Sequence, residues 1–380
     1  MIPRKLYDSD HDMFRDSIRK FLQIEAVPQH EQWEIDGMVS DEIWLRAGEQ
    51  GFLCPSVPLE YGGVGADFRY NCIVTEEVSR SGCSGLGWAL HSDISVPYIV
   101  RYGSEEQKEK YLKRCVSGEL ITAIAMTEPG AGSDIQGTKT SAVPDGDHYI
   151  LNGSKSFITN GQKAGLVIVV AKTDTSAGSK GISLFLVEEG MAGFTKGKKL
   201  QKLGLKAQDT AELFFQDVKV PKGNLLGEEG RGFIYLMQDL PQERLNIAVI
   251  ANGMCQSVLE ATVDYTKKRK AFGTSVAAFQ NTQFKLAELS AEVSSAEVFL
   301  DRCTELLLEG SLDSVTASKL KLLTTELQCK VADECLQLHG GWGYMWEYPV
   351  CRAFADARVQ RIYGGTNEIM KLIISRDLMS

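Results

Sequence analysis

The sequence has no run of about 18 consecutive apolar residues, so no segment is expected to span a membrane. Its N-terminus, MIPRKLYDSDHDMFRD, lacks the apolar core of a signal peptide and the Arg-rich, acid-poor character of a transit peptide. The sequence has 41 basic residues (Lys and Arg) and 50 acidic residues (Asp and Glu). The resulting net charge of −9 disfavours nucleic acid as a partner. We therefore expect a bacterial cytoplasmic protein or the processed form of a mitochondrial matrix protein.

Cysteine spacing excludes further kinds of site. The nine cysteines are scattered and form no CxxC pair, which indicates free buried thiols in a reducing compartment. No Cys or His lies at metal-ligand spacing from His339, and no nucleophile elbow surrounds a serine. The sequence therefore supports neither a metal site nor a Ser-His-Asp hydrolase.

What the sequence does contain divides its 380 residues into three parts, since this length exceeds one ordinary core. Residues 1–118 are predicted to be helical, with Ser40 and Ser104 as N-caps. Residues 119–226 carry short β-branched runs between turn signals and predict a β-sandwich or barrel. Residues 227–380 carry four long helical segments and predict a four-helix bundle. The predicted fold class is α+β, mainly α.

Several individual residues have two interpretations each. Three dipeptides are predicted to form hairpins or turns: Asp145-Gly146, Asn152-Gly153 and Asn160-Gly161. Phe157 is either a core residue or an aromatic wall against a flat cofactor, with Thr159 as a polar contact. Pro241 suits the first position of the first bundle helix, which places Glu243 in its first turn. There Glu243 is either an acidic residue favoured by the helix dipole or a general base.

Three other stretches are possible phosphate sites. Met126–Asp134 reads MTEPGAGSD after an apolar strand, and its free N–H groups and hydroxyls suit a phosphate. A plain loop is about equally consistent, because the third glycine of a dinucleotide fingerprint is missing. Arg269–Gly273 ends a helix, where basic residues either complement the dipole or bind a pyrophosphate. Gln337–Gly343 has more glycines than a C-cap needs, and its His339 is either a packed helical residue or a ligand.

Five motifs in the order TEPGAGSD, FITNG, RKAFG, LHGGWGY and IYGGTNEIM resemble those of the acyl-CoA dehydrogenases over essentially the whole chain. PQERL and GGWGYMWEYPV are most similar to the long-chain branch, with the isovaleryl branch next. The resemblance implies FAD-dependent removal of an α-proton and a β-hydride from a medium- or long-chain acyl-CoA, which gives a trans-2-enoyl-CoA in fatty-acid β-oxidation. It also implies a homotetramer of two dimers that passes electrons to electron-transfer flavoprotein.

The same resemblance implies two sets of site residues. The FAD set contacts the flavin and its pyrophosphate: Ile124, Ala125, Met126, Thr127, Gly132, Ser133, Phe157, Ile158, Thr159, Arg269, Gln280, Gln337, Leu338, His339, Gly340, Gly341, Thr366, Asn367 and Glu368. Of these, Arg269, Gln280 and Gln337–Gly341 hold the adenosine diphosphate half from a neighbouring subunit. The substrate set contacts the acyl-CoA: Ser133, Ser179, Lys180, Pro241, Gln242, Arg244, Gly364 and Gly365.

The catalytic base departs from the commonest family pattern. Many members carry it as the Glu of an IYEGT motif, where this sequence has Gly364. The long-chain and isovaleryl branches place it on the bundle helix, where this sequence has Glu243. The resemblance therefore implies an active enzyme with Glu243 as base and the Gly364 N–H as a donor to the thioester oxygen. The floor of the acyl pocket is expected to include His91–Tyr98.

Alternatives from other classes stay open at this point. A same-fold flavin monooxygenase or nitroalkane oxidase would turn over with O₂. A flavin-binding scaffold would bind FAD without being bleached by any acyl-CoA, and an all-helical binding protein would be colourless. The sequence leaves acyl chain length open, and branched, isovaleryl-like substrates remain included.

Overall fold

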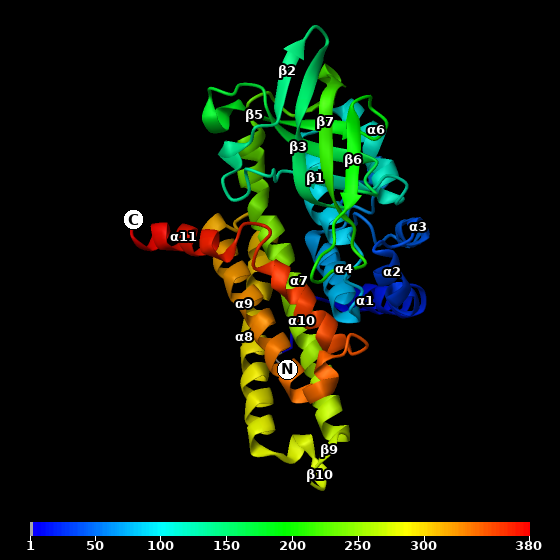
Figure 1. Cartoon of the computed structure of the whole chain (residues 1–380), viewed down its shortest axis with the longest axis vertical. Coiled ribbons are helices and arrows are strands. Elements are labelled where there is room, and N and C mark those ends of the chain that lie inside the picture. The colour runs from blue at the N-terminus through cyan, green and yellow to red at the C-terminus, as the bar shows by residue number, and fades with distance from the viewer. Residues whose placement is uncertain (1–2) are drawn as a thin grey trace.

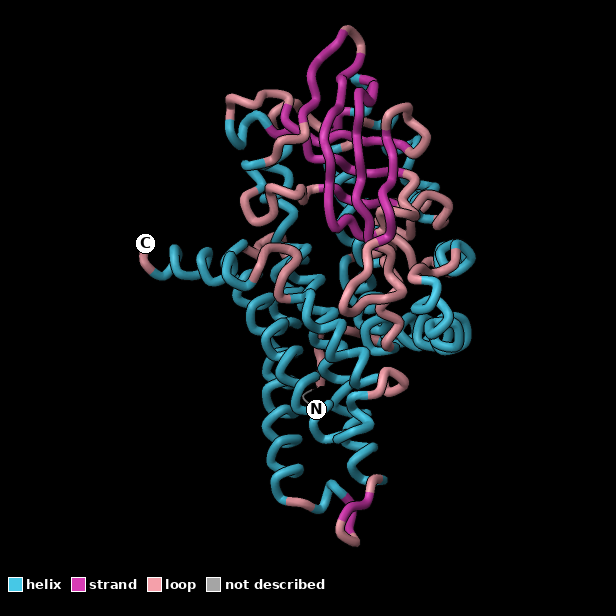
Figure 2. The backbone as a smooth tube through the Cα atoms, in the orientation of Figure 1, coloured by secondary structure: helices cyan, strands magenta, loops and turns pink. Residues whose placement is uncertain are grey.

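The computed structural model describes residues 3–380, in which an N-terminal helical domain, a β-sheet domain and a C-terminal helical domain follow one another along the chain (Figure 1). The sheet lies at one end of an elongated molecule, and the long helices extend to the other end (Figure 2). The predicted fold class, mainly α with a central β part, is confirmed.

The N-terminal helices begin where the sequence supplies side-chain caps. The Asp8 carboxylate accepts two backbone N–H groups at the start of the first helix, and the hydroxyls of Ser40 and Ser104 cap two others, as predicted. Two π-helical turns, Leu22–Ala26 and Leu90–Ser95, interrupt the regular helices. The helices are α1 Ser9–Phe21, α2 His30–Asp36, α3 Asp41–Glu49, α4 Phe68–Ser81, α5 Val96–Tyr102 and α6 Glu105–Val116.

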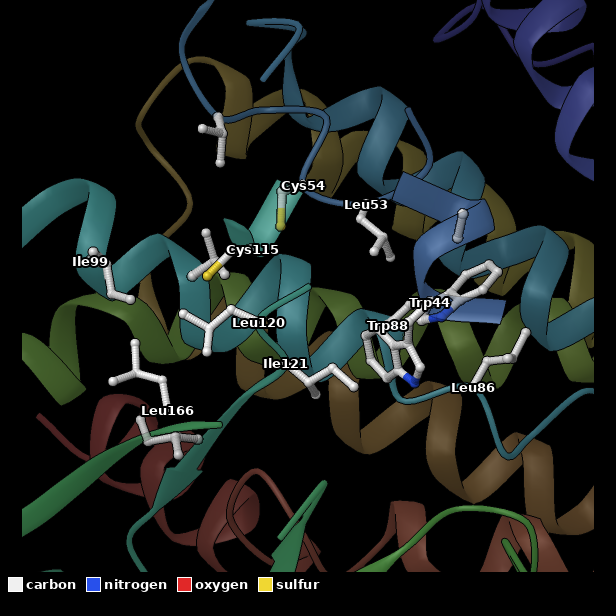
Figure 3. Packing of buried hydrophobic residues seen from close by; sticks show 14 of the residues in the cluster. Trp44, Leu53, Cys54, Leu86, Trp88, Ile99, Cys115, Leu120, Ile121 and Leu166 are labelled. Carbon is white, nitrogen blue, oxygen red and sulfur yellow. The ribbon is translucent and has the colours of Figure 1, made fainter. Parts of the chain in front are cut away.

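Two tryptophans form the centre of the N-terminal core. Trp44 and Trp88 are each 1% exposed and meet edge to face with ring centroids 6.4 Å apart. Figure 3 shows Leu86, Ile121 and neighbouring aliphatic side chains gathered around them. Such burial of large apolar surface is the main source of stability in a domain of this kind.

The strands form one mixed sheet in the order β6-β7-β3-β2-β4-β5-β8, with β1 paired in parallel with β4. Tyr149 on β3 packs edge to face on Phe185 of β5, although β2 and β4 lie between these strands. The expected sandwich or barrel is therefore a single sheet that folds back on itself. The strands are β1 Thr122–Ala125, β2 Ser141–Asp145, β3 His148–Thr159, β4 Leu166–Lys172, β5 Ile182–Glu188, β6 Phe194–Lys199, β7 Thr210–Pro221 and β8 Leu225–Leu226.

Strands β4 and β5 are buried on both faces. Val167 and Val169 belong to the core inside the sheet, whereas Ile168 and Val170 belong to the core shared with the N-terminal helices. This explains why the sequence of β4 is continuously apolar, with no alternation between apolar and polar residues. The N-terminal domain therefore covers one face of the sheet.

Two of the three predicted turns are confirmed. Asp145-Gly146 joins β2 to β3, and Asn160-Gly161 follows the end of β3. The prediction for Asn152-Gly153 was wrong, because both residues lie inside β3 at a shift in register against β7. A Cβ on Gly153 would lie only 2.4 Å from Thr140 Oγ1, so the glycine permits a bulge in a crowded strand.

The C-terminal bundle differs from its prediction in two respects. Pro241 is not at a helix start, because it lies within α7, whose nine preceding residues are already helical. The closing segment is two helices, separated at 361–366, where the Gly364–Gly365 pair turns the chain. The elements are α7 Gly232–Lys268, β9 Lys270–Ala271, β10 Thr274–Ser275, α8 Gln280–Leu308, α9 Ser314–His339, α10 Pro349–Gln360 and α11 Asn367–Leu378.

Other sequence expectations concern membrane spans, metals and thiols. Within residues 3–380 no helix is long and apolar enough to cross a membrane, and no group of three or more His, Cys, Asp or Glu side chains could hold a metal ion. All nine cysteines lie outside disulfides; seven are buried, and Cys329 and Cys351 are half-buried. Burial raises the pKa of the Cys115 thiol to about 12, which makes it unreactive.

Truncating Trp88 should strongly destabilise the N-terminal domain. We expect Trp88→Ala to lower the free energy of unfolding by about 3–5 kcal/mol, because it leaves a cavity among residues that cannot fully collapse. Leu59→Ala is the control, since Leu59 is 76% exposed and its truncation should change the value by less than about 0.5 kcal/mol. Urea unfolding followed by circular dichroism measures both, and equal effects would contradict the assignment of this core.

Candidate active site

Glu243 lies in the interior of the protein, two residues after Pro241 in α7. Its side chain is 5% exposed, and the hydroxyl of the buried Tyr98 donates a hydrogen bond to Glu243 Oε1 at 2.8 Å. Burial raises the pKa of Glu243 to about 7, although the hydrogen bond from Tyr98 and the charges of Arg244 and Arg101 act in the opposite direction. A carboxyl group with this pKa can both accept and release a proton near neutral pH.

The neighbouring residue Gln242 is held on another side of α7. Its amide donates to the backbone oxygen of Asp93 at 2.7 Å, and its oxygen accepts from Arg101 Nη2 at 2.5 Å. Arg101 also forms an ion pair with the buried Asp239. These contacts join α5 to α7 immediately beside Glu243 and fix the orientation of this part of the helix.

The Gly364–Gly365 turn faces the same part of α7. Both glycines have positive φ, +63° and +85°, a conformation that residues with a side chain rarely adopt. A Cβ on Gly364 would lie 2.2 Å from Cδ1 of Ile247, which is one helical turn after Glu243. The positions of the two alternative family bases therefore face a common space.

Three successive backbone N–H groups of this turn, those of Gly364, Gly365 and Thr366, have no acceptor among the residues that the structure describes. In contrast, the N–H groups of Ile362, Tyr363 and Asn367 are all hydrogen-bonded. Arg244, on the other side of the turn, is buried and donates to the hydroxyls of Ser314 and Ser318 on α9. The hydrogen bonds of Arg244 are therefore made to other residues of the protein, although Arg244 was predicted to contact the substrate.

Six of the predicted cofactor residues meet at one pocket of about 490 Å³. The pocket is lined by Arg269 at the end of α7 and by residues at the end of α9: Gln337, Leu338, His339, Gly340 and Gly341. His339 stacks on Tyr265 and its Nδ1 lies 2.8 Å from the Cys335 oxygen, so its side chain is packed as a helical residue. Gln280 is exposed and does not line this pocket.

Some of the predicted cofactor residues of the β domain, among them Phe157 and Gly132, lie at its surface. Phe157 is 69% exposed with φ of +61°, so its interpretation as a core residue was wrong. In the Met126–Ser133 loop, Gly130 and Gly132 have no other atom within 4 Å of a notional Cβ. These glycines are therefore not required by contacts within the chain, and they leave the backbone open to a ligand.

The remaining predicted residues occupy varied positions. In the FAD set, Ile124, Ala125 and Ile158 are buried, whereas Met126, Thr127 and Thr159 are half-buried. Ser133, Lys180 and Glu368 are exposed, and Ser179 is half-buried. Thr366 caps α11, and the Asn367 side chain is 1% exposed and hydrogen-bonded to α9.

Lys155 was not predicted as a site residue. Its buried ammonium binds Glu128 Oε1 at 2.8 Å beneath the 126–133 loop.

A second pocket, of about 340 Å³, adjoins Gln242 between α4, α5, α7 and the end of α8. Its apolar lining includes Phe68, Val100 and Leu307. Ser92, Val96 and Pro97 also line this pocket. All three belong to His91–Tyr98, the predicted floor of the acyl pocket.

Models of the acyl-CoA dehydrogenase N-terminal, middle and C-terminal domains match residues 8–119, 123–218 and 230–379. The chain belongs to the acyl-CoA dehydrogenase family, as the five ordered motifs predicted, and is an acyl-CoA dehydrogenase enzyme. The mitochondrial long-chain specific acyl-CoA dehydrogenase of Mus musculus is 55% identical over 379 residues, covering 99% of this chain and 88% of the mouse protein. The mitochondrial isovaleryl-CoA dehydrogenase of Solanum tuberosum is 38% identical over 376 residues, covering 98% and 91%.

Solved structures agree with this assignment. The acyl-CoA dehydrogenase from Geobacillus kaustophilus has a TM-score of 0.97 at 51% identity, covering 99% of this chain and 100% of that one. The Bacillus anthracis acyl-CoA dehydrogenase, solved in complex with FAD, has a TM-score of 0.92 at 34% identity, covering 100% of this chain and 69% of that one. The predicted similarity to the long-chain branch, with the isovaleryl branch next, is confirmed.

Removing the Tyr98 hydroxyl should shift the titration of Glu243. The hydrogen bond from Tyr98 stabilises the carboxylate and lowers its pKa, so in Tyr98→Phe the pKa should rise above its present value of about 7. Because the base must be ionised, the acidic limb of kcat/KM against pH should move to higher pH. Tyr102→Phe, which alters a half-exposed hydroxyl on the same helix, should leave the limb in place. An unmoved limb in Tyr98→Phe would separate Tyr98 from the base.

Proposed function

We propose that this enzyme uses FAD to dehydrogenate long-chain acyl-CoA thioesters to trans-2-enoyl-CoA in fatty-acid β-oxidation. The observation that carries the proposal is the buried Glu243, with a pKa of about 7, opposite the free N–H of Gly364. One supplies a base for the α-proton, and the other supplies a hydrogen-bond donor for the oxygen on which negative charge develops. Electron-transfer flavoprotein is the proposed electron acceptor.

Glu243 accepts the α-proton, and its burial keeps water away from it. Its carboxylate is held by Tyr98, so that one oxygen is hydrogen-bonded and the other is available to the substrate. The Gly364 N–H binds the thioester oxygen, and because it is part of a turn fixed before the substrate arrives, it needs no reorganisation in the transition state. Gly364 also leaves room beside Ile247 that any side chain at this position would occupy.

The residues of this chain fit FAD. The open glycines of the Met126–Ser133 loop suit a phosphate, and the exposed ring of Phe157 offers an apolar surface to a flat ring system. Arg269 and the Gln337–Gly341 backbone supply a charge and open glycines at the larger pocket. When bound, FAD supplies the acceptor for the β-hydride.

The two groups of cofactor residues belong to different subunits in this proposal. Arg269 follows Glu243 by 26 residues on the same helix, which corresponds to about 39 Å along its axis. Figure 1 shows the β9–β10 end of the bundle, which begins beside Arg269, far from the sheet that carries the other cofactor residues. One FAD can therefore use both groups only if a second chain supplies one of them, and a homotetramer of two such dimers meets this requirement.

The acyl chain extends into the second pocket in this proposal. Its lining is mainly apolar, and Gln242 connects it with the position of the base. The long-chain name of the mouse relative supports a substrate with a long tail.

Val100→Trp should fill the pocket and reduce kcat/KM for a C16 acyl-CoA at least about tenfold more than for a C6 acyl-CoA, since each excluded methylene loses about 0.8 kcal/mol of burial. Equal effects on both substrates would place the tail elsewhere.

Replacing the base should stop the chemistry without loss of the cofactor. We expect Glu243→Gln to retain FAD and acyl-CoA binding, while flavin bleaching in anaerobic stopped flow slows by at least about 10²-fold. Glu260→Gln, which removes an exposed carboxylate from the same helix, is the control and should bleach at the wild-type rate. Near-wild-type bleaching of Glu243→Gln would remove Glu243 from the mechanism.

Arg269 should connect cofactor affinity with assembly. We expect Arg269→Ala to weaken FAD binding by at least about tenfold, or 1.4 kcal/mol, and to shift the protein toward smaller oligomers. Lys268→Ala, an exposed neighbour outside the pocket, should change neither property. FAD titration of the apoprotein and light scattering measure the two effects. A loss of FAD affinity below about threefold, or 0.7 kcal/mol, would contradict the role assigned to Arg269.

A further inference from the structure

Lys321 is a buried lysine that the proposed mechanism does not use. Its side chain is 0% exposed on α9, and its ammonium donates to the Gly365 oxygen at 2.9 Å and to Asn367 Oδ1 at 2.8 Å. Burying an ammonium is unfavourable unless strong hydrogen bonds compensate for its lost hydration. Both of its acceptors belong to the segment that contains the Gly364 N–H.

Asn367 forms the second connection between this segment and α9. Its amide donates to Thr325 Oγ1 at 3.0 Å and to Glu326 Oε1 at 2.8 Å, while its backbone N–H donates to the Arg361 oxygen at 3.0 Å. The hydrogen bond from the Asn367 N–H to the Arg361 oxygen joins the two ends of the loop between α10 and α11. The Asn367 side chain is therefore engaged within the protein, and its contribution to the site is to hold this loop.

The charged groups that act on Lys321 belong to α7, α9, α11 and the loop that precedes α11. Burial, followed by Arg244 of α7 and by Arg361, lowers the pKa of Lys321 to about 8, whereas Glu368 of α11 and Glu326 of α9 act in the opposite direction. Lys321 is therefore charged at neutral pH, when its bonds to the two oxygens are strongest.

A turn of two glycines needs such an anchor. Glycine has more backbone freedom than any other residue, and Gly364 and Gly365 stand in succession at positive φ. A hydrogen-bond donor stabilises a developing oxyanion only if it is already aimed at it, and an error of about 1 Å can reduce the rate by 10²-fold.

We propose that Lys321, together with Asn367, is a positioning residue that fixes the Gly365 carbonyl and thereby aims the Gly364 N–H at the thioester oxygen. The inference rests on the proposed function. Lys321 touches neither substrate nor cofactor in this arrangement, and it acts through the orientation of one peptide group.

The holoenzyme carrying Lys321→Met tests this inference, with Lys319→Met as the matched control because Lys319 is exposed on the same helix. We expect bleaching at saturating acyl-CoA to slow at least about tenfold in Lys321→Met only, with KM little changed. Hydrogen exchange of residues 361–367 should become faster. Affinity for a 3-oxoacyl-CoA, which presents an enolate oxygen, should fall at least about tenfold more than affinity for an S-alkyl-CoA, which has no carbonyl.

The selective readout separates positioning from general damage. Equal losses of affinity for the 3-oxoacyl-CoA and the S-alkyl-CoA, or bleaching within about threefold of wild type, would overturn the inference. If Lys321→Met does not retain FAD, Lys321→Gln, which keeps a donor on a shorter chain, must show the same selective loss. A wild-type protein that no acyl-CoA bleaches would contradict the proposed function, whereas normal bleaching of Lys321→Met would contradict only the role of Lys321.

Discussion

Desolvation of the Glu243 carboxylate is the constraint on which the arrangement of the site depends. In water this group would be ionised at neutral pH and too weak a base to be useful, but burial brings its pKa to about 7. The environment must exclude water and still offer the ionised form some stabilisation, which the Tyr98 hydroxyl provides. The contacts of Gln242 with Arg101 and Asp93 keep the surrounding helices closed against each other. Packing of α5 on α7 is thus part of the proposed acid-base chemistry.

Helix α7 connects the three functional regions of the chain. Its first residues contact β5, where Gly232 permits close approach to the Ile182 and Ser183 backbone. Its middle carries Glu243, and its end leads into Arg269 at the larger pocket. A helix of 37 residues fixes these regions relative to one another, so in the proposed arrangement a cofactor bound at its end and a base in its middle serve different copies of the site.

Local sequence signals predicted the elements well and their contacts less well. The caps at Ser40 and Ser104 follow from short-range chemistry, and both were predicted correctly. Pro241 was misplaced because Tyr235 and Leu236, which precede it, are buried against the N-terminal core and extend the helix backward. Contacts between residues far apart in the chain could not be predicted. Helical periodicity places Lys321 on a buried face with Leu320 and Thr325. Nothing in the sequence indicates that the hydrogen-bond acceptors of Lys321 come more than 40 residues later. Roles derived from the family resemblance alone, including most of the cofactor residues, remain predictions.

The double burial of β4 and β5 has a consequence for how the chain must be made. Both strands are largely aliphatic and aromatic, and one face of each is covered by the N-terminal helices and by the start of α7. Separated from those helices, the β domain would present a wide, low-charge apolar surface with strong β-propensity, a combination that favours intermolecular strand pairing. The N-terminal helices and the start of α7 therefore shield the sheet, and we expect a β domain expressed alone to aggregate.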